Sequence, residues 1–94
     1  MEDKMRKKEL LLCNASGLHA RPATVFIEKA KTFQSKLTIQ LKGSEVAGNA
    51  KSIITLLALG AGLGDTILLT ADGTDEEEAI KELSLLIESG FGEV

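Results

Sequence analysis

The sequence predicts a single α+β domain in which helices pack on one face of an antiparallel sheet. Three observations favour this class. Strand-like and helix-like segments follow one another in the order β-α-β-β-α-β-α. Hydrophobic residues make up 44% of the 94 residues, which is enough to build one core. Three Phe and no Trp or Tyr leave that core to Leu, Ile, Val and Ala.

The first third of the chain predicts a strand, a loop and a helix. Residues 1–8 are charged and are expected to fray at the end of the domain. Residues 9–14 read as a strand that is apolar enough to be buried on both faces. A loop over 14–18 follows. The helix is predicted over residues 20–33, because apolar side chains recur from Ala23 at the spacing i, i+3, i+4 and i+7.

The middle of the chain predicts a strand and a short return strand. Apolar and polar side chains alternate over residues 36–42, which indicates a half-buried strand. Gly43 and Ser44 mark a tight turn. The chain then returns over residues 45–47, and Gly48 is expected to break this second strand.

A short helix is predicted next, with Ser52 as its N-cap and Gly60 just beyond its end. It is apolar on nearly every side, and a two-turn helix in so small a domain cannot bury every face. We assign Leu56 and Leu59 to the core. The remaining apolar side chains then form a candidate surface for docking partners, namely Ile53, Ile54 and Leu57. The alternative is that all of them belong to the core.

The last third predicts a turn, a strand and a helix. The Gly-rich turn over 61–65 lacks the Lys-Ser/Thr of a phosphate-binding loop, which argues against nucleotide binding. A strand over 66–71 precedes a capping box, with Thr74 as N-cap and Glu77 at position N3. The helix ends at Gly90. Its predicted buried stripe is Ala79, Ile80, Leu83, Leu86 and Ile87.

Composition excludes several classes of function. A net charge of −3 and few aromatic residues argue against a nucleic-acid-binding surface. The single cysteine, Cys13, cannot form an internal disulfide and suits a reducing cytoplasm. One Cys and one His cannot build an ordinary zinc site, and no stretch approaches transmembrane length. We therefore expect a cytoplasmic monomer without a metal, another cofactor or a membrane partner.

The only histidine and the only proline lie close together. Pro22 lacks an N–H group and fits the first turn of a helix, which places His19 at the helix N-terminus beside Arg21. The unpaired N–H groups and the positive end of the helix dipole bind anions there. An imidazole at this position can attack a phosphoryl group whose oxygens Arg21 holds. The alternative is a histidine that serves only as a cap or a loop residue.

Two motifs resemble a known family. The segment Gly-Leu-His-Ala-Arg-Pro-Ala at 17–23 resembles the active-site signature of HPr, the histidine-containing phosphocarrier of the bacterial phosphoenolpyruvate:sugar phosphotransferase system. The segment Lys-Ser-Ile-Ile at 51–54, with the apolar run up to Gly60, resembles the family's regulatory-serine segment. The resemblance covers residues 9–93. It implies an open-faced β-sandwich, a four-stranded antiparallel sheet covered on one face by three helices.

The resemblance also implies roles for individual residues. His19 would accept a phosphoryl group from phospho-enzyme I, through the ring nitrogen nearer the backbone, and pass it to IIA components of sugar permeases. Arg21 would stabilise the phosphate, and Ser16 would contact it. The protein would thus be a carrier and not an independent enzyme. Leu18 is expected to bind partners together with the apolar short helix. Ser52 would be phosphorylated by an HPr kinase/phosphorylase and then recognised by a transcriptional regulator.

Other interpretations stay open at this point. Residues 42–50 look about two residues longer than the family's usual segment. Extra residues in a turn reduce the stability of the fold only slightly. They lie next to Ser52, however, where a kinase or a transcriptional regulator would have to recognise the protein. Residues 33–35 and 91–93 also resemble NPr, the nitrogen-branch paralogue. The sugar branch is our first interpretation because Pro22 follows Arg21. A regulatory HPr-like module acting through Ser52, or a scaffold that dimerises through its apolar helix, would be non-transferring alternatives.

Overall fold

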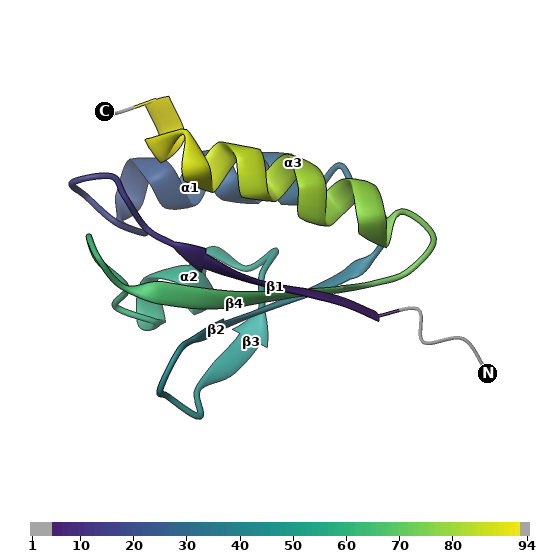
Figure 1. Cartoon of the computed structure of the whole chain (residues 1–94), viewed down its shortest axis with the longest axis horizontal. Coiled ribbons are helices and arrows are strands. Elements are labelled where there is room, and N and C mark those ends of the chain that lie inside the picture. The colour runs from purple at the N-terminus through teal and green to yellow at the C-terminus, as the bar shows by residue number, and fades with distance from the viewer. Residues whose placement is uncertain (1–4, 93–94) are drawn as a thin grey trace.

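The computed structural model describes residues 5–92, which form one four-stranded antiparallel sheet and three α-helices (Figure 1). The elements in chain order are β1 (Met5–Leu11), α1 (Ala20–Ala30), β2 (Lys36–Leu41), β3 (Ala47–Asn49), α2 (Ile53–Ala58), β4 (Thr66–Asp72), α3 (Glu76–Glu88) and the 3-10 turn η1 (Gly90–Gly92). The strands lie in the order β1-β4-β2-β3. The predicted element order and fold class are confirmed.

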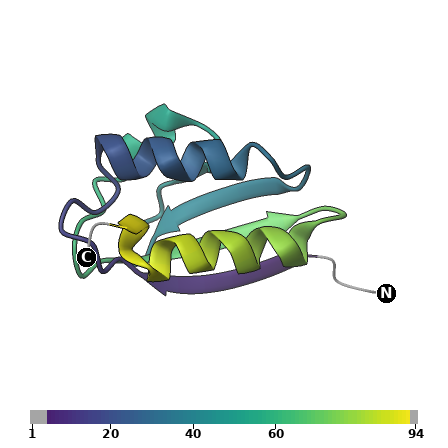
Figure 2. The same cartoon turned by 90° about the horizontal axis from the view of Figure 1, so that it is seen from above.

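The helices make one layer and the sheet the other (Figures 1 and 2). α1 and α3 run side by side over one face of the sheet, and α2 flanks α1 and packs against β3. Within residues 5–92, no helix covers the opposite face of the sheet. No helix in this described part of the chain is long and apolar enough to cross a membrane.

The core lies between the two layers. Alternate residues of β2 and β4 point into it, and the predicted stripe of α1 closes it from above. Of the predicted α3 stripe, Ala79, Leu83 and Ile87 are buried and Ile80 packs against the core, whereas Leu86 is only half-buried. Each of these buried Leu, Ile or Phe side chains contributes about 1.5–3 kcal/mol to the stability of the fold. The largest fully buried apolar side chains are Phe26, Leu12, Leu37, Ile39, Leu56, Ile67, Leu69, Leu83 and Ile87.

The first strand begins at Met5, before the predicted Glu9. Residues 5–8, which we expected to fray, instead pair antiparallel with residues 69–72 of β4. Arg6 and Lys8 find partners on α3, where the Arg6 Nε lies 3.5 Å from a carboxylate oxygen of the nearly buried Glu76. A charged strand is stable here because β4 supplies its backbone hydrogen bonds. The rest of the predicted frayed segment, residues 1–4, lies outside the described residues.

The prediction that the first strand is buried on both faces is wrong. Leu10 and Leu12 lie in the core, but Leu11 between them is 57% exposed. A strand of an open-faced sheet buries only the side chains on its helix-covered face. The three successive leucines therefore alternate between core and solvent, although the sequence shows no alternation of apolar and polar residues.

The return strand is β3, and it lies later than predicted. Gly48, expected to break the strand, sits at its centre opposite Ile39 of β2. A Cβ atom at Gly48 would come within 2.9 Å of the Thr55 side chain on α2. The glycine thus allows α2 to pack closely against β3, which a sequence pattern alone does not reveal.

The start of α3 also differs from the predicted capping box. The N-cap is Asp75 and not Thr74, and the helix begins at Glu76. In a capping box, a glutamate side chain of the first turn accepts a hydrogen bond from a backbone N–H three residues earlier. Glu76 makes this bond, with the Gly73 N–H at 3.0 Å, and not the predicted Glu77.

The Asp75 carboxylate does not cap its own helix. It accepts hydrogen bonds from the Gln34 N–H at 2.8 Å and the Ser35 N–H at 2.9 Å, and a further bond from the Ser35 hydroxyl. The Ser35 hydroxyl bond, with the Gln34 N–H bond next, holds the pKa of Asp75 below its ordinary value. A single side chain thus ties the α1–β2 connection to the start of α3.

Candidate functional site

His19 is the N-cap of α1. Its backbone is extended (φ −98°, ψ −169°), and its carbonyl accepts the first intrahelical bond, from the Ala23 N–H at 2.8 Å. The imidazole makes no capping hydrogen bond to the helix, and the residue is exposed. The predicted position of His19 at a helix N-terminus is confirmed, and its ring faces solvent.

The residues after His19 make this helix start electropositive. The N–H groups of Ala20 and Arg21 precede the first intrahelical bond, so they are available to an anion. Arg21 is exposed in the same turn, and its guanidinium adds a full positive charge. Pro22 is buried in this first turn, where its missing N–H removes no helical bond.

The loop before His19 is held in place by the Gly-rich turn at 61–65. The Leu18 N–H donates to the Ala61 carbonyl at 3.0 Å. Gly17 has a φ of +62°, and a Cβ atom there would lie 2.5 Å from the Ala61 oxygen and from the Gly62 Cα. Only glycine fits such a contact without displacing the loop. Gly17 therefore fixes the backbone that leads to His19.

Sequence reasoning missed Asn14 in this loop. Its side chain is fully buried, and Nδ2 donates to the Gly17 carbonyl at 3.0 Å. An asparagine a few residues before a glycine is a signal for such a loop-closing bond. The side chain thus stabilises the turn on which the position of His19 depends.

The other predicted residues of this loop have different surroundings. Ser16 is exposed, at the tip of the loop. Leu18, predicted to bind partners, is only 3% exposed and belongs to the core. That prediction is wrong, because Leu18 anchors the loop from inside and its side chain is not available at the surface.

α2 has the two faces that were predicted. Leu56 and Leu59 are buried, whereas Ile53 (39%), Ile54 (77%) and Leu57 (45%) are exposed. We call these three exposed residues the α2 patch. Because α2 packs against α1, the patch lies on the helix that neighbours the one carrying His19. The amphipathic division leaves an apolar surface close to the candidate site.

Ser52 is the N-cap of α2, as predicted. Its Oγ accepts a hydrogen bond from the Thr55 N–H at 3.3 Å, and the residue is half-buried. It lines a hollow of about 550 Å³ between α1 and α2, together with Lys31, Lys51 and two residues of the α2 patch. A charged group placed on Ser52 would therefore stand beside that patch.

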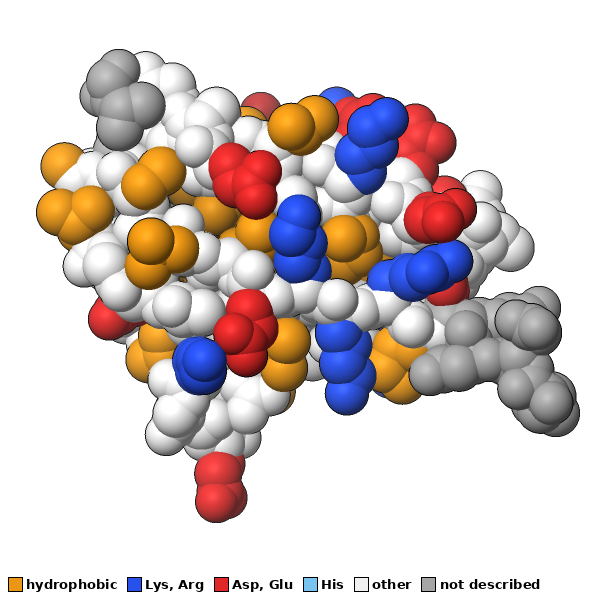
Figure 3. Space-filling model, viewed as in Figure 1, with side chains coloured by type: hydrophobic (Ala, Val, Ile, Leu, Met, Phe, Trp, Pro, Cys, Tyr) orange, Lys and Arg blue, Asp and Glu red, His pale blue; other side chains and the backbone are white. Residues whose placement is uncertain are grey.

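The apolar surface extends to the end of the molecule that carries the site. Figure 3 shows hydrophobic side chains gathered at the left end, where Figure 1 places the β1–α1 loop. Leu63, in the turn that supports this loop, is among the exposed leucines. Over β1 and α3, by contrast, acidic and basic side chains alternate (Figure 3). One end of the molecule is thus suited to contact another protein.

The arrangement can hold a phosphoryl group in transit. It offers an exposed imidazole, a guanidinium and free N–H groups at one helix start. Phosphoryl transfer needs chiefly positioning and charge stabilisation, which these groups supply. A shallow surface site allows one protein to deliver the group and another to remove it.

Comparisons with known proteins point to the same kind of chemistry, a phosphorylated carrier. A family model described as "PTS HPr component phosphorylation site" matches residues 6–89. Phosphocarrier protein HPr of Borreliella burgdorferi is 45% identical, over 90% of this chain and 96% of the relative. HPr-like protein Crh of Halalkalibacterium halodurans is 42% identical, over 89% and 98%. The crystal structure of HPr-C-His from Thermoanaerobacter tengcongensis superposes with a TM-score of 0.89, at 43% identity over 95% and 98% of the two chains.

Proposed function

Because the chain belongs to the HPr family, and is thus a phosphocarrier of the phosphotransferase system and not an enzyme, we propose that His19 carries the phosphoryl group. The observation that supports this most is the exposed imidazole at the N-cap of α1. His19 is also the only histidine in the chain. The matched residues 6–89 include it.

Transfer exchanges the bond between phosphorus and the donor for a new P–N bond. The lone pair of the ring nitrogen nearer the backbone attacks the phosphorus, and the bond from phosphorus to the donor's side chain breaks as the new bond forms, so that its electron pair returns to the donor. Arg21 and the N–H groups at the start of α1 balance the charge on the phosphoryl oxygens. Ser16, in the adjacent loop, contacts the same oxygens. The reverse exchange delivers the group to the acceptor.

The partners are phosphotransfer proteins of the same system, of the enzyme I and IIA kinds. We propose phospho-enzyme I as donor and IIA components of sugar permeases as acceptors, all in the cytoplasm. The α2 patch would be the docking surface, because it is apolar, exposed and carried by the helix that packs against α1. Donor and acceptor would use it in turn.

Ser52 is proposed as a regulatory phosphorylation site for an HPr kinase/phosphorylase. A phosphate at the N-cap of α2 is compatible with the helix dipole and need not unfold the domain. It would introduce a dianion beside Ile53 and Ile54, which line the same hollow as Ser52. Apolar or acidic partners would then bind more weakly, and a basic partner such as a transcriptional regulator would bind more strongly.

The test is phosphorylation by phosphoenolpyruvate, magnesium and purified enzyme I, followed by intact mass before and after brief acid treatment. We expect the gain of one phosphoryl group that acid removes, and no gain in His19→Ala. Ser52→Ala is the matched control and should be labelled like the wild type. An acid-labile gain in His19→Ala would overturn the assignment to His19.

A further inference from the structure

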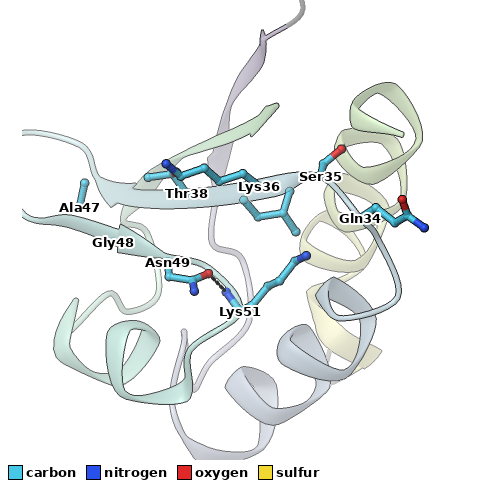
Figure 4. A pocket seen from close by; sticks show the side chains of 9 residues that line it. Gln34, Ser35, Lys36, Thr38, Ala47, Gly48, Asn49 and Lys51 are labelled. Carbon is cyan, nitrogen blue, oxygen red and sulfur yellow. Dashed lines mark hydrogen bonds between the residues drawn. The ribbon is translucent and has the colours of Figure 1, made fainter. Parts of the chain in front are cut away.

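A second hollow, of about 490 Å³, lies at the edge of the sheet (Figure 4). β2 extends here beyond its last pair with β3, Thr38 with Asn49. The hollow lies near Phe33, which follows α1, and so at the end of α1 opposite His19. We call it the β2–β3 groove. The residues that matter to its chemistry are Gln34, Lys36, Leu37, Thr38, Asn49 and Lys51.

The polar groups that line the groove are mostly hydrogen-bond donors. The Asn49 Oδ1 already accepts from the Lys51 N–H at 2.9 Å, drawn as a dashed line in Figure 4, which leaves Nδ2 to donate. The Lys51 ammonium donates one bond to the Phe33 carbonyl at 2.7 Å, so two of its three N–H groups remain. Lys51 is thus held in position while it keeps capacity for a ligand.

The groove carries positive charge without a matching carboxylate. Among residues 5–92, no carboxylate lies within 4 Å of the Lys36 or the Lys51 ammonium, including Asp72, the register partner of Lys36 on β4. The nearby Asp75 is occupied by the hydrogen bonds it accepts from residues 34 and 35. Figure 4 shows Lys36 extending along β2 toward Thr38, whereas Lys51 approaches from the other side of the groove.

We propose that the β2–β3 groove binds a small metabolite that carries two anionic groups, at least one of them a phosphate. Two lysines that approach from different sides match two separate charges, and lysine binds phosphate as a point charge. The Thr38 hydroxyl and the Asn49 and Gln34 amides suit a hydroxyl-bearing body between them. The volume lies within the range of about 300–1,000 Å³ that small-molecule sites occupy.

Binding of an anion in the β2–β3 groove would also change the charge beside the α2 patch. Lys51 lines both the groove and the hollow between α1 and α2, and it precedes Ser52. A bound anion would neutralise a charge next to the α2 patch. The binding itself does not depend on the role proposed for His19, so either proposal can fail alone.

The experiment is a titration of the full-length protein, labelled with nitrogen-15, followed through its amide NMR signals. The probes are 3-phosphoglycerate with two anionic groups, glycerol 3-phosphate with one, and neutral glycerol. We expect saturable shifts at residues 34–38 and 49–51 with the first probe, weaker binding of the second and none of the third. Added salt should weaken the binding, since the pairing is between charges.

Variants locate the site. Lys36→Met and Lys51→Met should each weaken the binding of 3-phosphoglycerate by about three- to fivefold, as expected for a partly exposed charge pair. Lys81→Met, on the exposed side of α3, is the matched control and should leave binding unchanged. Lys36→Met leaves the hydrogen bond between Lys51 and the Phe33 carbonyl intact. It therefore tests the binding site even if Lys51→Met fails to fold.

Three results would overturn the proposal. The first is the absence of saturable shifts in the groove. The second is shifts confined to residues 19–21, which would place the phosphate at the transfer site. The third is equal weakening by the control Lys81→Met, which would indicate only non-specific attraction to the protein's charge.

Discussion

At the scale of single residues, Asp75 shows how one ionised group can hold two segments together. Its carboxylate binds the connection between α1 and β2 from the start of α3. Because these bonds lower its pKa below 3.8, they stabilise the folded state fully above that pH. The contribution is lost as the pH falls below 3.8 and through the lowered pKa of the folded protein.

Asp75→Asn should therefore lower the urea midpoint of unfolding at pH 7, where the wild-type carboxylate is charged. As the pH falls below 3.8 the difference between the two midpoints should shrink, because protonation removes the same charge from the wild type. The measurement is a set of urea unfolding curves across this range. Glu45→Gln, an exposed carboxylate in the β2–β3 turn, is the control and should keep the wild-type midpoint. A midpoint difference that stays constant down to pH 2 would contradict the argument.

Some site residues could be predicted from sequence and others could not. The place of His19 followed from local rules, because a proline after it restricts where the helix can begin. Leu18 was misplaced because the sequence next to His19 looks the same whether the leucine side chain points into the core or toward solvent. Its direction is set by the contact between Gly17 and the turn at 61–65, which lies far away in sequence. Asn14 was missed for the same reason.

At the scale of elements, α2 was predictable and β3 was not. A helix of six residues has too little surface to hide five apolar side chains, so the division into core and patch follows from geometry. β3 has three residues, and its position is set by how closely α2 approaches Gly48. Such a contact between elements leaves no periodic pattern in the sequence.

The α2 patch makes a prediction at this scale. Ile54→Asp places a charge at its most exposed position, so folding should be unaffected. Phosphorylation by limiting enzyme I should slow by about tenfold, the effect of losing one central apolar contact of an interface. The rate is read by intact mass over time, with a thermal unfolding curve for each variant.

Leu85→Asp is the control for that experiment. Leu85 is also an exposed leucine on a helix, but α3 carries it away from the α2 patch. Its substitution should leave the phosphorylation rate unchanged. If both substitutions slowed phosphorylation equally, the effect would come from the change in net charge. The α2 patch would then not be the docking surface.

At the scale of the whole molecule, the sheet extends to residues that looked dispensable. Deleting residues 1–8 removes four of the seven residue pairs between β1 and β4, together with the contact between Arg6 and Glu76. We expect the free energy of unfolding to fall by about 2 kcal/mol, from a few backbone hydrogen bonds at about 0.5–1.5 kcal/mol each. Urea unfolding measures this.

Deleting only residues 1–4 preserves that ladder and is the matched comparison. The difference in the free energy of unfolding between the two deletions is therefore the contribution of residues 5–8. Equal stability of the two deletions would mean that the paired residues 5–8 add nothing, and that the strand effectively begins at Glu9 as its sequence suggests.

The strand order has a further consequence for how the protein is made. β4, the last strand to be synthesised, lies between β1 and β2, so before residues 66–72 exist β1 has no strand to pair with and β2 can pair only with β3. On a ribosome the first sixty-five residues can offer only helices and the short β2–β3 hairpin. The four-stranded sheet is therefore completed only when β4 arrives, and this long-range pairing makes folding slow relative to a helical bundle of similar size.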